Sequence, residues 1–158
     1  MRVDLDLVEA RWRIGLIMRN DLHAVAGELL DDGISADALI ELFALPIDAV
    51  FWRGAPLFER ALTDLGGGRM TEEEAAQALA RDLARRVLSG TLPPAEGTSL
   101  AASIHVRTGY RFDCFHELYV LDDEMTSIDR SGRSYLGRTE ADVAEDVRIE
   151  ARRIHDEG

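Results

Sequence analysis

Apolar side chains recur every three or four residues along most of the chain, and this spacing places them on one face of an α-helix. The first run contains Leu5, Val8, Trp12 and Leu16. An aspartate on either side of Leu5 can cap this helix, because its carboxylate accepts hydrogen bonds from the first backbone N–H groups. The pattern therefore predicts an amphipathic helix at the start of the chain and a second helix after Asn20.

The region between residues 35 and 68 has the same apolar spacing but contains proline and glycine. Proline favours the first turn of a helix and glycine favours its end. The sequence therefore predicts three short helices here, over residues 35–45, 46–54 and 55–66. The glycine-rich residues 66–70 are interpreted as a helix stop and a possible hinge.

The strongest helical pattern covers residues 71–89. Thr71 is followed three residues later by Glu74, which is the spacing of a capping box. Acidic residues fill the first turn and arginines lie near the other end, as the helix dipole favours. The predicted buried face of this helix consists of Ala76, Leu79, Leu83 and Val87.

Two further helices are expected in the last third of the chain. One begins near Pro94 and is predicted to bury Leu100, Ile104 and Val106. The other begins at Thr139 and presents a stripe of apolar residues. This stripe consists of Val143, Val147, Ala151 and Ile154. Residues 126–138 are rich in Ser, Gly and Arg and are predicted to form a loop.

Residues 112–125, with the sequence FDCFHELYVLDDEM, are the part of the chain that most resembles a site. They fit a helix with one apolar and one polar face, although a short apolar run can also form a strand. We therefore predict an all-α, single-domain, multi-helix bundle of about eight helices over residues 1–158. The alternative is an α+β fold with a small hairpin around 115–137.

Thirty acidic residues against eighteen basic ones give a formal net charge of −12. Such a surface disfavours nucleic acids and anionic membranes, because both are bound through basic charge. It allows a basic protein partner, whose approach it would accelerate. All eighteen basic residues are arginines, so a lysine nucleophile or phosphate-loop lysine is excluded. No secretory signal or membrane span is recognised, so a cytoplasmic location, in a bacterium, is expected.

Asp113 and His116 are three residues apart, so a helix would place a carboxylate and an imidazole on one face. With His105 or His23 they are the candidate metal ligands. However, the two-histidine zinc motif is absent, because Val120 stands where its second histidine would be. A solvated helix face is therefore favoured over a metal site. Cys114 lies in an acidic and aromatic setting that does not activate a thiol, and is expected to be buried.

Two groups of residues are candidates for partner binding. The first is the acidic run Asp122, Asp123 and Glu124, which is interpreted as a solvated helix end within a binding face. The second is Trp52 with Arg53, since these two residue types are frequent at the centres of interfaces. For Trp52, packing in the core is the favoured alternative.

The sequence contains no catalytic motif, and no cofactor is expected. The favoured function is a non-enzymatic, acidic protein-binding module, for example an immunity or antitoxin-like inhibitor of a basic partner. One alternative is a small metal-dependent enzyme that uses His116 and Asp113. Another is a structural or regulatory homodimer that buries one of the helix faces.

Overall fold

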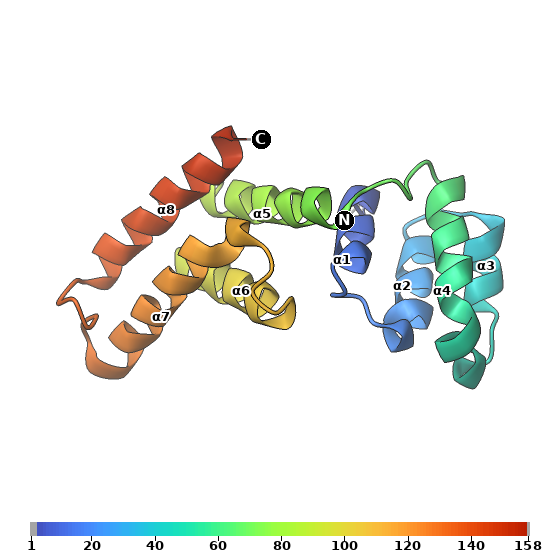
Figure 1. Ribbon diagram of the computed structural model, residues 1–158, viewed down its shortest axis with the longest axis horizontal. Coiled ribbons are helices and arrows are strands. Elements are labelled where there is room, and N and C mark those ends of the chain that lie inside the picture. The colour runs from blue at the N-terminus through green and yellow to red at the C-terminus, as the bar shows by residue number, and fades with distance from the viewer. Residues whose placement is uncertain (1–2, 158) are drawn as a thin grey trace. The chain divides into compact units, whose positions relative to one another are not determined.

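The structure is a computed structural model that describes residues 3–157 (Figure 1). Within this range it contains eight α-helices and two short 3-10 helices, and none of the described residues forms a β-strand. The all-α prediction is therefore confirmed, and the alternative of a hairpin around 115–137 is wrong. No helix among these residues is long and apolar enough to cross a lipid bilayer.

The chain divides into two compact units, Met1–Ala75 and Ala76–Gly158. The elements of the first unit are α1 Leu5–Arg13, η1 Arg19–Asp21, α2 Leu22–Asp31, α3 Asp37–Phe43 and α4 Ile47–Asp64. Helices α2, α3 and α4 pack against one another, and η1 packs against α2 and α4. The core of this unit consists mainly of buried leucine, valine and alanine side chains around Phe58.

The elements of the second unit are α5 Glu72–Leu88, α6 Pro94–Arg107, η2 Asp113–Phe115, α7 His116–Ser131 and α8 Glu140–Asp156. The boundary between the units falls in the first turn of α5. Helices α6, α7 and α8 pack against one another, and η2 packs against α6 and α7. The prediction that residues 1–158 form one domain stays a prediction.

Helices α5 and α8 form as their sequences predict. Thr71 and Glu74 make the capping box, with the Thr71 N–H donating to Glu74 Oε2 at 2.8 Å and the Glu74 N–H donating to Thr71 Oγ1 at 3.2 Å. Thr139 caps α8 in the same way. The predicted inward faces of both helices are confirmed as buried: Ala76, Leu79, Leu83, Val87, Val143, Val147, Ala151 and Ile154.

Helix α4 corrects the prediction of two short helices over 46–54 and 55–66. It continues through Pro56, although proline lacks the N–H of one helical hydrogen bond and its ring crowds the preceding turn. Pro56 is exposed, whereas Phe58, Ala61 and Leu62 on the following turns are buried. The packing of this inward face offsets the lost hydrogen bond, so the two predicted segments are one helix.

The buried face of α6 also differs from the prediction. Leu100 and Val106 are 43% and 49% exposed, and the buried residues are instead Gly97, Thr98, Ala101, Ala102 and His105. The reason is close approach. A Cβ atom at Gly97 would lie 2.6 Å from Cγ2 of Val87. Small residues allow this contact, and larger aliphatic residues on the same face would prevent it.

Helix α7 extends further than predicted, through residues 126–131 of the expected loop. Met125 and Ile128 are buried, so packing holds the helix for this additional length. It ends at Gly132, whose φ of 78° is the left-handed conformation that favours glycine at a helix C-terminus.

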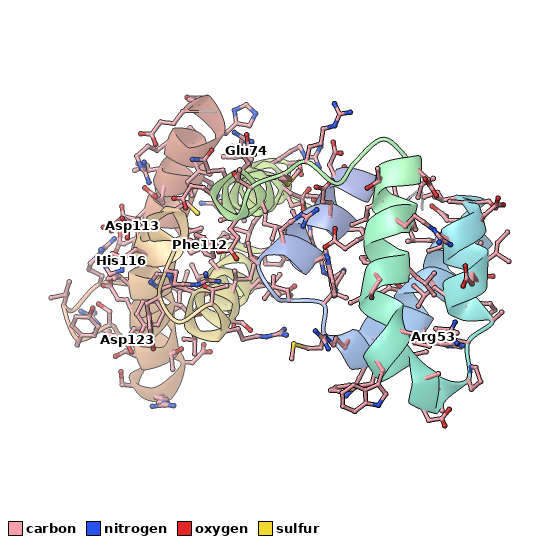
Figure 2. All side chains as sticks on the ribbon, turned by 45° about the vertical axis from the view of Figure 1, so that its right-hand side comes forward. Arg53, Glu74, Phe112, Asp113, His116 and Asp123 are labelled. Carbon is pink, nitrogen blue, oxygen red and sulfur yellow. The ribbon has the colours of Figure 1, made fainter. Side chains whose placement is uncertain are left out.

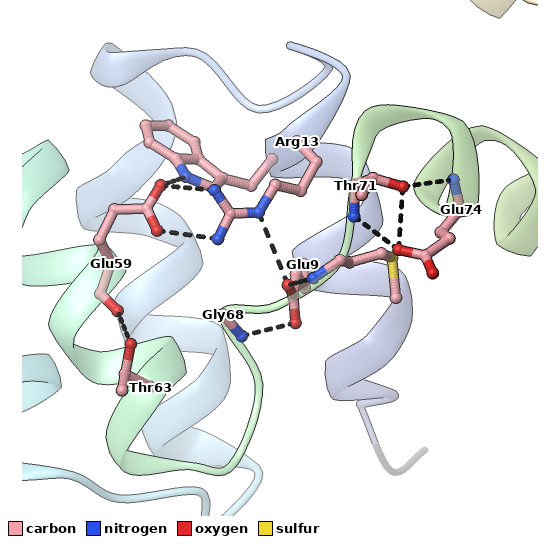
Figure 3. A network of polar contacts seen from close by, with 9 residues as sticks. Glu9, Arg13, Glu59, Thr63, Gly68, Thr71 and Glu74 are labelled. Carbon is pink, nitrogen blue, oxygen red and sulfur yellow. Dashed lines mark hydrogen bonds and ion pairs between the residues drawn. The ribbon is translucent and has the colours of Figure 1, made fainter.

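The predicted hinge at 66–70 lies beside a buried carboxylate (Figure 3). Glu9 of α1 is only 3% exposed, and its two oxygens accept hydrogen bonds from the N–H groups of Gly68 and Met70, both at 2.9 Å. Arg13 lies on the other side of Glu9, with Nε 3.6 Å from Oε1. These contacts hold the glycine-rich segment against α1. Hinge motion itself stays a prediction.

Arg13 links this carboxylate to α4. Its guanidinium donates two hydrogen bonds to Glu59, at 3.1 and 3.0 Å, and the indole N–H of Trp12 donates to the same carboxylate at 2.6 Å (Figure 3). The Trp12 ring also meets Phe58 edge to face, with 5.3 Å between centroids. The network therefore connects α1, α4 and the 66–70 segment within the first unit.

Candidate functional site

The segment 112–125 forms η2 and most of α7. Phe112, Phe115, Leu118 and Met125 are buried, which agrees with the predicted apolar face. Figure 2 shows Asp113 of η2 close to His116, the first residue of α7, and Asp123 further along α7. All three are exposed. Cys114 is half-buried, whereas a buried thiol was expected.

His105 of α6 lies against this segment and is only 2% exposed. Its ring centroid is 5.1 Å from that of Tyr110, 5.4 Å from Tyr119 and 5.7 Å from His116. Its Nδ1 atom is buried without a hydrogen-bond partner. Burial lowers the pKa of His105, and the neighbouring His116 lowers it further, whereas the Phe112 backbone and Asp113 act in the opposite direction.

The structure thus brings three of the candidate metal ligands, His105, His116 and Asp113, into the same region. Among the described residues, however, no group of three or more His, Cys, Asp or Glu side chains is arranged to hold a metal ion. His23 lies in the first unit, stacked on Phe43. The metal-dependent enzyme stays an untested alternative.

Next to His105, two tyrosines and two carboxylates form a surface that we call the tyrosine–carboxylate face: Tyr110, Tyr119, Asp122 and Asp123. The tyrosine rings meet edge to face, with 5.8 Å between centroids. Tyr110 is 54% exposed and has a φ of 61°, which is unusual for a residue with a side chain. Its N–H donates to the carbonyl of His105 at 2.8 Å, so the chain turns back onto α6.

The charges of this face act on one another. A hydrogen bond with Tyr110 raises the pKa of Tyr119, and the charges of Asp123 and Asp122 contribute to the rise. Asp122 is half-buried and accepts a hydrogen bond from Thr98 Oγ1 at 3.2 Å. Burial raises the pKa of Asp122, and Asp123 adds to this effect. Both carboxylates therefore act on the hydroxyl of Tyr119.

Glu124 does not share in this surface. It is 3% exposed, so the expectation that it faces solvent with Asp122 and Asp123 is wrong. The Arg138 guanidinium contacts Glu124 Oε2 at 3.3 Å and also pairs with Asp146 of α8. Glu124 belongs to the buried face of α7, and its ion pair with Arg138 compensates the buried charge. Glu124 therefore joins α7 to the turn before α8.

A depression of about 290 Å³ continues along α7 from the tyrosine–carboxylate face. It is lined by Asp123, Thr126, Ser127, Arg130, Ser131 and Tyr135. Asp123 belongs to both surfaces.

Trp52 and Arg53, the second predicted group, are both exposed and belong to α4 in the first unit (Figure 2 labels Arg53). Trp52 is 75% exposed, so the expectation that it packs in the core is wrong. Helix α4 already fills its inward face with other apolar side chains, and Trp52 lies on the outward face.

The sequence interpretation missed Tyr110 and Tyr119 as members of the site. Tyr119 stands three and four residues before Asp122 and Asp123, a spacing that places them on one helix face. The sequence therefore contained a signal for Tyr119. It contained none for Tyr110, because the position of Tyr110 depends on a left-handed backbone after α6.

Comparisons of the chain with protein-family models, with curated proteins and with solved structures gave no match.

Burial of His105 predicts that the protein loses stability in mildly acidic solution. Its pKa is lower in the folded state than the ordinary value of 6.5. As the pH falls below about 6.5, the unfolded chain takes up a proton before the folded chain does, so the free energy of unfolding decreases until the folded pKa is reached. Urea denaturation at a series of pH values between about 7.5 and 5 measures this slope.

The matched variants are His105→Gln and His155→Gln. His155 is an exposed residue of α8 in the same unit. The His105 variant should show a shallower dependence on pH than the wild type, whatever its stability at neutral pH. An unchanged slope in this variant would contradict the assignment.

Proposed function

We propose that the protein is a non-enzymatic, acidic protein-binding module that recognises a basic partner through the tyrosine–carboxylate face. The observation that carries the proposal is that Asp122 and Asp123 follow Tyr119 by three and four residues on α7, while the Tyr119 ring meets Tyr110 edge to face. Carboxylates next to exposed aromatic rings suit a guanidinium or ammonium group, which pairs with the acid and lies over the ring.

The half-buried Asp122 has a role of its own in this proposal. A charged carboxylate in a poorly solvated position gains more from a bound cation than one in water, because screening there is weaker. Its pKa is raised in the unbound protein, and a bound cation would lower it again. Binding should therefore weaken as the pH falls and Asp122 becomes protonated.

The charge of the whole chain supports the same class of partner. The formal net charge of −12 attracts a basic protein over a longer range than any single contact. The size and acidity of the chain suit an inhibitor that covers a basic surface of a toxin, as immunity proteins and antitoxins do. This finer proposal requires that the partner be an enzyme and that its activity stop on binding.

The test is a pull-down with the full chain followed by association kinetics at two salt concentrations. Replacing Asp122 and Asp123 by Asn should slow association about threefold to tenfold and flatten its salt dependence, because fewer charges steer the partner. Tyr119→Leu should mainly accelerate dissociation, because it removes a short-range contact.

The control carries the same change in charge elsewhere in the second unit, as Asp129→Asn with Glu140→Gln, two exposed positions outside the face. The proposal requires a larger effect from the Asp122 and Asp123 pair than from this control. An acidic partner, or equal effects of the two double variants, would refute it.

A further inference from the structure

Helix α4 has a second apolar surface, which its own unit does not cover. We call it the α4 patch and define it by Met18, Ile47, Phe51 and Trp52. The exposed fractions of these side chains are 57%, 73%, 41% and 75%. Phe51 and Trp52 meet edge to face at 4.8 Å, and the η1 segment that follows Met18 packs against α4. Exposed apolar groups of this kind mark interaction surfaces.

The charges around the α4 patch are balanced, unlike those of the chain as a whole. The exposed charged residues that neighbour its members in the sequence are Arg19, Asp21, Asp48 and Arg53. Arg19 lies over the Phe51 ring, 5.9 Å from its centroid. Two positive and two negative groups give this rim a formal charge of zero, whereas the chain carries −12.

We propose that the α4 patch binds the same patch of a second copy of this chain. Two copies with a charge of −12 repel each other, so they can meet most easily where the local charge is zero. In a contact with twofold symmetry the same surface of both copies takes part. Each rim then offers arginines to the aspartates of the other, and the exposed Trp52 and Ile47 of both copies are buried together.

This proposal is independent of the tyrosine–carboxylate face, which lies in the other unit. A variant with Asp122→Asn and Asp123→Asn should therefore form the dimer as the wild type does. The dimer and the basic partner can in this way be tested separately.

The experiment measures the molar mass of the full chain in solution by light scattering and sedimentation. The wild type should form a dimer at concentrations up to about 100 µM, the range in which weak specific contacts are still populated. The double variant Ile47→Ser with Trp52→Ser should remain a monomer over the same range. Both positions are exposed, so circular dichroism should show the wild-type helix content.

Charge variants test the symmetry of the contact. Arg53→Glu makes the rim acidic and Asp48→Arg makes it basic. Each variant alone should therefore stay monomeric, because two like-charged rims repel each other. Mixing the two should restore a dimer that contains one copy of each. A wild type that stays monomeric, a dimer that survives loss of Ile47 and Trp52, charge variants that dimerise like the wild type, or a mixture that does not pair would each overturn the proposal.

Discussion

Replacing Leu83 by Ala should lower the free energy of unfolding by about 2–5 kcal/mol, the range for a buried leucine whose cavity does not collapse. Leu83 is 4% exposed on the inward face of α5. It faces α6, and a Cβ at Gly97 would be 3.9 Å from its Cδ2. Urea denaturation followed by far-UV circular dichroism measures the change.

The matched control is Leu100→Ala on α6 of the same unit. Leu100 is 43% exposed, so its loss should change the free energy of unfolding by at most about 0.5 kcal/mol. The sequence pattern alone predicts a large effect for both leucines, whereas the structure predicts it for one. Similar losses in the two variants would show that the inward face of α6 has been assigned wrongly.

Both tryptophans, Trp12 and Trp52, belong to the first unit, so tryptophan fluorescence reports on that unit. Circular dichroism reports on all helices. If residues 1–158 form one cooperative domain, Leu83→Ala should shift the unfolding transitions seen by fluorescence and by circular dichroism to the same urea concentration. Separate transitions would divide the chain into two domains and replace the prediction of a single one.

The parts of the fold that could be predicted from the sequence are those set by local signals. The capping box of Thr71 and Glu74 and the stripe from Val143 to Ile154 each require only a few neighbouring residues. Where packing depends on the distance between helices, the sequence pattern gave the wrong face. In α6 the large aliphatic Leu100 and Val106 were expected inside, although the close approach to Val87 requires Gly97 there.

The errors at the candidate site have a similar physical origin. Glu124 was grouped with Asp122 and Asp123 because all three are acidic, but the inward face of α7 includes Glu124. Its partner Arg138 lies fourteen residues away, beyond the end of the helix, and no local pattern connects them. Trp52 shows the reverse case. Its size favours burial, but the inward face of α4 is already filled.

Replacing Glu9 by Ala should destabilise the first unit by about 1–3 kcal/mol, the range for leaving a buried hydrogen-bonding group without its partner. The variant leaves the N–H groups of Gly68 and Met70 without their acceptor and removes a charge beside Arg13. Tryptophan fluorescence during urea denaturation measures the loss, because Trp12 lies in the same network. Glu28→Ala, an exposed position on α2, is the control.

Glu9 also predicts a dependence on pH that the variant should lack. Burial acts to raise the pKa of Glu9, but the hydrogen bonds from Met70 and Gly68 and the charge of Arg13 lower it below the ordinary value of 4.5. The unfolded chain therefore binds the proton at a higher pH than the folded chain. The stabilisation is complete above about pH 4.5 and is lost as the pH falls through the folded pKa.

A second variant distinguishes the effect of the Glu9 charge from the effect of losing its side chain. Glu9→Gln keeps the size of the side chain and one carbonyl acceptor but has no charge to titrate. It should fall between the wild type and the Ala variant in stability at neutral pH, and its stability should change less with pH below 4.5. If Glu9→Ala is as stable as Glu28→Ala, the 66–70 segment does not depend on this carboxylate, and another contact must hold it against α1.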